Sequence, residues 1–201
     1  MRAKWSEATE LIPRYDITTL TETKLDEAAS AGSIAVPGFQ INRQDRTSHG
    51  GGVATYLRED LRPEPMLELQ SKYVSESLEI TITKIQVCKP ERSIVVIGVY
   101  RPPSAKASWF EAFNELVTTA SALGQIIIMG DLNADLIKPN EYPGSALLKS
   151  LALAKTTIQD IKPTRVTDSC ATCLDIIAMS TDLNCTSYNT GELMLRQYWN
   201  N

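Results

Sequence analysis

The chain has 201 residues, a length that favours one domain with a sizeable buried core. Apolar residues make up 43% of the sequence and charged residues 22%, which excludes a disordered or fibrous protein. The formal net charge of −4 excludes a broadly basic nucleic-acid binder, but it leaves room for a local basic surface.

The sequence shows no secretory signal, because charged residues interrupt its first ten positions, where a signal peptide needs an apolar segment. The longest apolar run, at residues 94–100, is too short to span a bilayer. We therefore expect an intracellular protein without a membrane partner, with the nucleus as one candidate compartment.

The four cysteines are expected to be reduced thiols in such a compartment; they are Cys88, Cys170, Cys173 and Cys185. Cys170 and Cys173 have the spacing of half a zinc site. No second close pair completes it, and the single histidine, His49, is far away in the sequence. We therefore expect no zinc site.

The first third of the chain predicts a helix followed by two strands. Apolar residues at 5, 8, 11 and 12 recur at helical spacing, and Pro13 ends this amphipathic helix. A short strand is expected at residues 17–21. A loop containing the PGF sequence at 37–39 follows, and the run GGGVATYL at 50–57 predicts a turn that enters a second strand.

The middle of the chain predicts two strands, a helix and a third strand. Alternating apolar residues between 78 and 82 predict a half-buried strand, and the apolar run at 94–100 predicts a fully buried one. Apolar residues on one face predict a helix at 108–123. Gly124 ends this helix, and the strand that closes with IIIMGDLNAD begins at once.

The last third predicts a helix at 144–154 and a strand at 173–179. Strands that alternate with helices, together with hairpin-like neighbours, indicate a mixed-sheet α/β domain.

Carboxylates and an amide lie at the ends of these strands. Glu22 follows the first strand, Asp131 and Asn133 end a later one, and Asp175 lies in or beside the last. Ligands in α/β sheets usually bind at strand ends, and oxygen ligands suit a hard cation such as Mg²⁺. Taken singly, Glu22 also fits a solvated cap, and the DLNA sequence also fits a plain Asx-turn.

Six sequence stretches together resemble a known family. TETKLD, GGGVATYLRE, VYRPPS, IIMGDLNAD, PTR and TCLDII occur in the order seen in the endonuclease/exonuclease/phosphatase (DNase I-like) superfamily. They are most similar to the apurinic-type endonuclease domain of non-LTR (LINE-type) retrotransposon polyproteins. The resemblance implies a four-layered α/β/β/α sandwich of two mixed sheets flanked by helices. It would span residues 1–182, with a divergent tail at 183–201.

The resemblance also implies a role for each strand-end residue. Glu22 matches the metal-binding glutamate, and Tyr100 matches a tyrosine that contacts a phosphate oxygen. Asp131 matches the aspartate that orients or deprotonates the attacking water, and Asn133 the asparagine that helps to hold the phosphate. Asp175 matches the aspartate that orients a catalytic histidine.

A reaction and partners follow from the same resemblance. The implied reaction is Mg²⁺-dependent (or Mn²⁺-dependent) hydrolysis of a phosphodiester by in-line attack. The substrate would be DNA, and the 3′ hydroxyl left by the nick would prime the reverse transcriptase domain of the same polyprotein. No obligate protein partner is indicated.

Two motifs of the family have no match here. The family begins with a strand that carries an asparagine near the metal, and we expect a central position of the sheet to be empty without it. The family also ends with Ser-Asp-His, whereas the tail contains neither Asp nor His. His49 lies where the family has no catalytic group. We therefore expect a chain truncated at both ends and impaired in catalysis.

Two other functions stay open: a dead remnant that at most binds nucleic acid, and a phosphomonoesterase relative that acts on a small substrate. A DNA-facing surface is open in the same way. Five arginines, Arg43, Arg46, Arg58, Arg62 and Arg101, fit either such a surface or scattered solvated charges.

Overall fold

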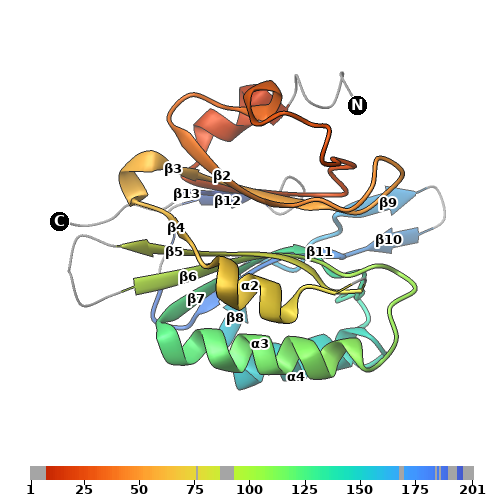
Figure 1. Cartoon of the computed structure of the whole chain (residues 1–201). Helices are drawn as coiled ribbons and strands as arrows, with labels where there is room; N and C mark the ends of the chain where they lie inside the picture. Colours follow the sequence, from red (N-terminus) through yellow and green to blue (C-terminus); the bar gives the residue numbers. More distant parts are fainter. Residues whose placement is uncertain are drawn as a thin grey trace.

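The structure is a computed structural model of the chain, and it describes residues 8–75, 77–86, 93–167, 170–183, 185, 187–189 and 194–196. The start of the opening helix around Trp5, the thiol of Cys88 and the end of the tail lie outside these residues. Two sheets pack face to face, and helical segments cover their outer faces (Figure 1).

The first sheet has five strands in the order β12-β13-β1-β3-β2, and its described pairings are antiparallel. Its strands are β1 (Ile17–Thr21), β2 (Phe39–Gln44), β3 (Val53–Arg58), β12 (Ser187–Asn189) and β13 (Met194–Arg196). Two strands from the tail at 183–201 therefore belong to this sheet.

The second sheet has six strands in the order β4-β5-β6-β7-β11-β8. They are β4 (Glu64–Pro65), β5 (Glu79–Gln86), β6 (Ser93–Tyr100), β7 (Gln125–Asp131), β8 (Thr156–Ile158) and β11 (Asp175–Ser180). Among the described pairings of this sheet, only β6 and β7 are parallel, because helix α3 (Trp109–Leu123) connects them as a crossover. Strands β9 (Arg165–Thr167) and β10 (Cys170–Thr172) form a separate hairpin that projects from one end of the molecule (Figure 1).

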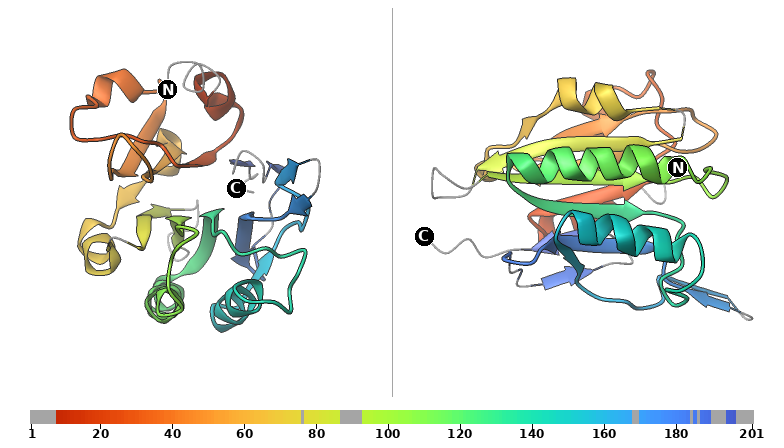
Figure 2. Two further views of the ribbon diagram at one scale, coloured as in Figure 1. Left: turned by 90° about the vertical axis from the view of Figure 1, so that its right-hand side faces the viewer. Right: turned by 90° about the horizontal axis from the view of Figure 1, so that it is seen from below.

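Helices complete the four layers. Helix α2 (Leu67–Tyr73), α3 and α4 (Gly144–Leu153) cover the outer face of the six-stranded sheet, with α3 and α4 side by side (Figure 2). Residues 8–11 are helical and, with the 3-10 turns η1 (Ile12–Arg14) and η2 (Ala31–Ile34), lie over the five-stranded sheet. A third 3-10 turn, η3 (Glu59–Leu61), follows β3. The predicted α/β/β/α sandwich is confirmed. None of the helices in the described ranges is long and apolar enough to cross a membrane.

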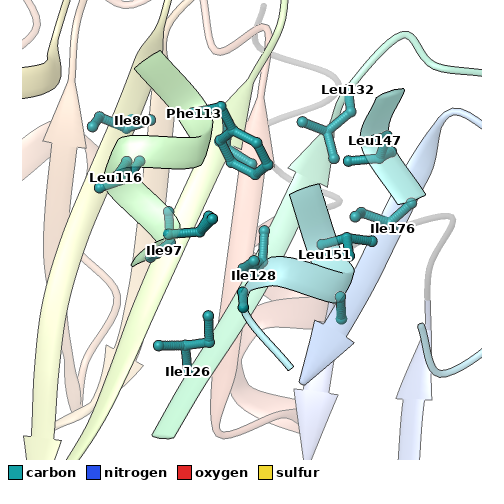
Figure 3. Packing of buried hydrophobic residues seen from close by; sticks show 14 of the residues in the cluster. Ile80, Ile97, Phe113, Leu116, Ile126, Ile128, Leu132, Leu147, Leu151 and Ile176 are labelled. Carbon is teal, nitrogen blue, oxygen red and sulfur yellow. The ribbon is translucent and has the colours of Figure 1, made fainter. Parts of the chain in front are cut away.

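Three apolar clusters fill the spaces between the layers. The largest joins the six-stranded sheet to its helices, where Ile97 and Ile128 meet Phe113 of α3 and Leu151 of α4 (Figure 3). A second lies between the sheets and includes Ile17, Leu57, Ile94, Ile127 and Ile177. A third packs Ile12 and Val36 against Tyr56 on the outer face of β3. Burial on both faces explains why the central strands are nearly continuous apolar runs.

The strand predicted between residues 78 and 82 is fully buried, so the prediction of a half-buried strand is wrong. Thr81 and Thr83 look solvent-facing in the sequence, but their exposed fractions are 0% and 1%. The five-stranded sheet covers this face, and the Thr55 hydroxyl bridges Thr19 at 3.2 Å and Thr81 at 2.6 Å. The hydrogen bonds between these hydroxyls offset the cost of taking them out of water. The threonines can therefore face the other sheet, although their polarity suggests a face exposed to solvent.

Two other expectations are also wrong. The chain after the PGF sequence is not a loop but the edge strand β2, and its buried residue Asn42 donates to Gln70 of α2, a helix that the sequence did not predict. The central position expected to be empty is filled in part, because β13 pairs with Ile17 and Thr18 of β1. An inner strand needs partners for its backbone groups on both sides, and the described part of the tail supplies them for these two residues.

Candidate active site

Four polar residues form a row across the end of the six-stranded sheet. Glu79 of β5 is the register partner of Tyr100 of β6, Tyr100 is the partner of Asp131 of β7, and Asp131 is the partner of Asp175 of β11. Register partners point to the same face of a sheet. This face is the one covered by the five-stranded sheet, because Glu79 and the inter-sheet residue Thr81 are two positions apart on β5.

The five-stranded sheet contributes Glu22, which directly follows β1. Its backbone is left-handed, with φ of 53°, and its Oε2 accepts a hydrogen bond from the Gly51 N–H at 3.1 Å. The hydroxyl of Tyr100 lies close enough to the Glu22 carboxylate to lower its pKa. The two sheets therefore approach each other at the row of polar residues.

Glu22 and Tyr100 titrate in opposite directions. Burial disfavours the ionised Glu22, but the Tyr100 hydroxyl, the Gly51 N–H and the charges of Lys24 and Arg46 together outweigh it, so the pKa of Glu22 is lowered. Burial raises the pKa of the Tyr100 hydroxyl, and the neighbouring carboxylates raise it further. At neutral pH Glu22 is therefore an anion, and Tyr100 is a neutral hydrogen-bond donor.

A glycine turn connects the carboxylates of the two sheets. Gly51 N–H binds Glu22, and the next amide, Gly52 N–H, binds Glu79. Both glycines have positive φ, 77° and 89°. A Cβ at position 51 would lie 2.6 Å from the Glu79 carboxylate, so only glycine allows the backbone this close. The GGG run thus serves to bring the backbone up to two carboxylates as well as to start β3.

Asp131 is the most strongly perturbed carboxyl of the row. Its Oδ1 accepts from the Asn133 N–H at 3.0 Å, which is the Asx-turn expected from the sequence. Burial, followed by the charges of Asp175 and Glu22, raises the pKa of Asp131 to about 6, although Asn133 and Arg165 oppose the rise. The Asx-turn is therefore part of the site, because it fixes the Asp131 carboxyl where it faces the carboxyls of Asp175 and Glu22.

Asn133 is held by Arg101, the residue that follows strand β6. Its backbone is left-handed, with φ of 44°, and its side-chain amide donates to the carbonyl of Arg101 at 2.8 Å. The Arg101 guanidinium is buried and donates to the carbonyls of Ala105 at 2.9 Å, Asn133 at 3.4 Å and Leu132 at 3.5 Å. Arg101 therefore fixes the loop that follows β7 and does not line a DNA-facing surface.

Asp175 begins β11 and is fixed by the chain just before the β9–β10 hairpin. The Thr164 hydroxyl accepts from the backbone N–H of Asp175 at 3.2 Å and lies close enough to its carboxyl to lower the pKa. Burial raises the pKa of Asp175, and Thr164 offsets only part of the rise. No histidine of the described chain contacts Asp175. His49 lies in the exposed turn before Gly50, where its ring pairs with the Ser48 hydroxyl.

The structure thus brings Glu22, Tyr100, Asp131 and Asp175 together, with Asn133 beside them on the loop after β7. Sequence reasoning missed Glu79 and Thr164. Glu79 is 3% exposed and bonds to Gly52 and Arg46. A charged residue at the start of an otherwise apolar strand was the available signal, but such residues usually face water.

A divalent metal ion fits this site through Glu22. Within the described residues, no group of three or more His, Cys, Asp or Glu side chains is arranged to hold a metal by itself. Mg²⁺, however, keeps several waters and needs only one or two protein carboxylates. Glu22 is ionised and partly exposed, and a hydrogen bond orients one of its two oxygens, so it suits this kind of anchor.

Two stacked sheets with carboxylates and a tyrosine gathered at one end define the DNase I-like class of α/β proteins. The chain belongs to the endonuclease/exonuclease/phosphatase family, whose sequence profile matches residues 6–191. Members of this family are hydrolases and generally use divalent metal ions. Comparison with curated proteins gives no sequence match.

Solved structures support the fold. The endonuclease domain of TRAS1, a telomere-specific non-LTR retrotransposon, is similar with a TM-score of 0.62 at 15% identity, covering 90% of this chain and 79% of that one. A 3′–5′ exonuclease from Neisseria meningitidis gives 0.66 at 16% identity, covering 89% and 82%. ANGEL2, a 2′,3′-cyclic phosphatase, gives 0.63 at 13% identity, covering 95% and 78%. The non-LTR endonuclease expected from the sequence is thus among the structural neighbours, beside an exonuclease and a phosphatase.

Proposed function

We propose that the protein is a Mg²⁺-dependent endonuclease of the non-LTR retrotransposon type that nicks one strand of DNA. The observation that carries this proposal is the meeting of the two sheets, where the Gly51 N–H orients Glu22 beside Tyr100 and the facing pair Asp131 and Asp175. It gathers an ionised carboxylate, a neutral donor and a carboxyl with a pKa of about 6 within one small region.

Each residue has a chemical task in phosphodiester hydrolysis. Asp131 is ionised above about pH 6 and accepts the proton of the attacking water. The second amide N–H of Asn133 donates to a phosphate oxygen, and the single O–H of Tyr100 turns from Glu22 to donate to another. Glu22 would hold the divalent ion, which when bound supplies positive charge against the phosphate. The leaving oxygen lacks a histidine donor at Asp175, so we expect slow cleavage.

The choice of DNA over a small phosphate ester rests on the motif order that resembles non-LTR endonucleases. In that setting, the reverse transcriptase domain of the same polyprotein is the partner that uses the 3′ hydroxyl, and the nucleus is the compartment of the target. The competing functions are a phosphomonoesterase and a remnant that only binds nucleic acid.

A plasmid assay tests the proposal. Supercoiled DNA is incubated with the protein in Mg²⁺, Mn²⁺ or EDTA, and extension by a DNA polymerase detects a 3′ hydroxyl at each nick. Asp131→Asn is the matched control, because the amide oxygen can keep the Asx-turn while the carboxylate is lost. We expect metal-dependent nicking by the wild type that this variant lacks.

The other outcomes favour the competing functions. Phosphate release from a monoester without nicking would identify a phosphomonoesterase. DNA binding without either reaction would identify a remnant. Equal nicking by the wild type and Asp131→Asn would place the activity outside this site.

A further inference from the structure

The five arginines that could line a DNA-facing surface differ in their positions and partners. Arg58 pairs with Asp16 at 2.6 Å at the end of β3 far from the glycine turn, and Arg62 follows η3 at that same end. Arg43 pairs with Asp45 at 3.3 Å, and Arg101 is buried behind the loop after β7. Among these five, Arg46 is the one that forms an ion pair with a carboxylate of the site, Glu79.

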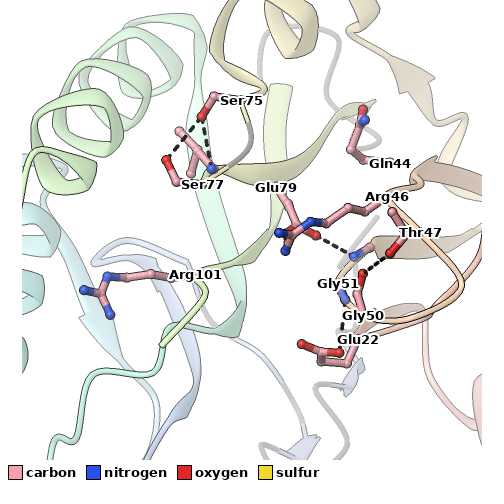
Figure 4. Close-up of polar contacts among 12 residues, drawn as sticks. Glu22, Gln44, Arg46, Thr47, Gly50, Gly51, Ser75, Ser77, Glu79 and Arg101 are labelled. Carbon is pink, nitrogen blue, oxygen red and sulfur yellow. Dashed lines mark hydrogen bonds and ion pairs between the residues drawn. The ribbon is translucent and has the colours of Figure 1, made fainter. Parts of the chain in front are cut away.

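Arg46 crosses the glycine turn to reach the buried row. Its Nη1 donates to Glu79 Oε1 at 2.8 Å, and a Cβ on Gly51 would lie 2.6 Å from its Cδ (Figure 4). Its positive charge also lowers the pKa of Glu22 on the other side of Gly51. The side chain of Arg46 is 44% exposed, whereas that of Glu79 is 4% exposed. The guanidinium is therefore anchored from inside the protein and open to solvent outside.

A phosphate substrate needs a positively charged hydrogen-bond donor in the site, and Arg46 is one. Glu22, Glu79, Tyr100, Asp131 and Asp175 are anionic or neutral, so a phosphate needs positive charge beside them. Lys24 lies near Glu22 and Arg165 near Asp131, but Arg46 is the cation that forms an ion pair with a carboxylate of the row. A guanidinium carries five N–H donors in a rigid fork that matches phosphate oxygens. Within the described residues, Glu79 takes one of these donors and the remaining ones have no protein acceptor.

We propose that Arg46 binds a non-bridging oxygen of the substrate phosphate and that Glu79 is the positioning residue that holds Arg46 for this contact. The proposal rests on the proposed phosphoester hydrolysis at the same site. The competing explanation is that Arg46 only neutralises the buried Glu79 carboxylate and has no contact with substrate.

A double-mutant cycle separates the two explanations. Arg46→Met leaves Glu79 buried without its partner, so both explanations expect a lower melting temperature and lower activity. The double variant Arg46→Met with Glu79→Gln removes both charges and restores internal neutrality. If Arg46 only neutralises Glu79, the double variant regains activity together with stability. If Arg46 binds phosphate, the double variant regains stability alone, and its nicking rate stays about 100-fold or more below the wild type.

Two binding measurements do not depend on turnover. In EDTA, the affinity for a short DNA duplex is measured against salt, and loss of one phosphate contact lowers the slope of log K against log salt by about 0.9. The second is the rise in melting temperature with inorganic phosphate. For Arg46→Met and for the double variant, we expect the salt slope to fall by this amount and the phosphate-induced rise in melting temperature to disappear. Arg62→Met is the matched control, since it removes an exposed arginine at the far end of β3.

The outcomes keep this inference apart from the proposed function. A double variant that nicks like the wild type, or an Arg46→Met variant that keeps both the salt slope and the phosphate effect, overturns the role of Arg46. A wild type that fails to nick DNA but shows a phosphate effect that depends on Arg46 overturns the endonuclease and leaves the phosphate contact standing.

Discussion

Asp131 and Asp175 face each other as register partners on the antiparallel strands β7 and β11, and the pKa of each carboxyl is raised, chiefly by burial. Two carboxyls in such a position resist simultaneous ionisation, so at least one of them holds a proton to higher pH than usual. Without a metal ion, the ionisation of these carboxyls therefore destabilises the folded protein at neutral pH. Carboxyls with perturbed pKa values are typical of functional sites.

The first expectation concerns the pH dependence of stability. The pKa of Asp131 is raised from 3.8 to about 6 in the folded protein, so between these values the native state keeps a proton that the unfolded chain has released. Stability therefore falls as pH rises through this window, by about 3 kcal/mol for Asp131 alone, and levels off above it.

Asp131→Asn removes this titration. We expect the variant to match the wild type near pH 4 and to be more stable above pH 6, in EDTA, by up to about 3 kcal/mol. Urea unfolding at pH 4, 6 and 8 measures the difference, with Asp182→Asn on the surface as the control. A difference in unfolding free energy that does not grow with pH would show that the surroundings do not raise the pKa of the Asp131 carboxyl.

The second expectation concerns the metal. Glu22→Gln keeps an oxygen for the Gly51 N–H but removes the charge, so the variant should lose the Mg²⁺-induced rise in melting temperature. A ligand at a hundred times its Kd stabilises the wild type by about 2.7 kcal/mol, which a thermal melt resolves easily. Glu115→Gln on the exposed face of α3 is the control. An unchanged response in Glu22→Gln would assign the ion to other residues.

The elements that could be predicted from the sequence are those fixed by local patterns. Helix α3 follows from a periodicity of 3.6 residues and strand β7 from a continuous apolar run, and Asp131 and Glu22 follow from their positions at strand ends. The missed elements depend on distant partners. The buried Asn42 of β2 is satisfied by Gln70 of α2, 28 residues away.

Glu79 was missed for the same reason. Its partners are Gly52, 27 residues away, and Arg46, 33 residues away. A carboxylate at the start of a strand looks solvated until the fold brings an amide and a guanidinium to it. The resemblance to the family could not supply it either, because the quoted motifs carry no role for this position.

The third expectation concerns the loop after β7. Arg101→Met keeps an apolar side chain beside the rings of Trp109 and Phe110 but leaves three backbone carbonyls without their guanidinium donor. At about 1 kcal/mol for each hydrogen bond, we expect a loss of roughly 2–3 kcal/mol. Activity should fall further than the unfolded fraction explains, since Asn133 and Asp131 lose their fixed backbone. Nicking rates measured well below the melting temperature check this, and a rate equal to that of the wild type would contradict it.

The last expectation concerns the glycine turn, which offers an internal control. Gly51 has φ of 77°, and a Cβ there would lie 2.6 Å from both Arg46 Cδ and Glu79 Oε2, whereas a Cβ on Gly50 would meet only Glu22 Oε2, at 3.8 Å. Gly51→Ala should therefore cost roughly 2 kcal/mol or more of stability, from left-handed strain plus the displaced ion pair. Gly50→Ala should stay within about 0.5 kcal/mol of the wild type. Because Gly51 also donates to Glu22, its variant should bind Mg²⁺ more weakly even after correction for stability. Thermal melts of both variants, with and without Mg²⁺, measure the two effects, and equal behaviour of the two alanine variants would show that the close approach at Gly51 has no role in the site.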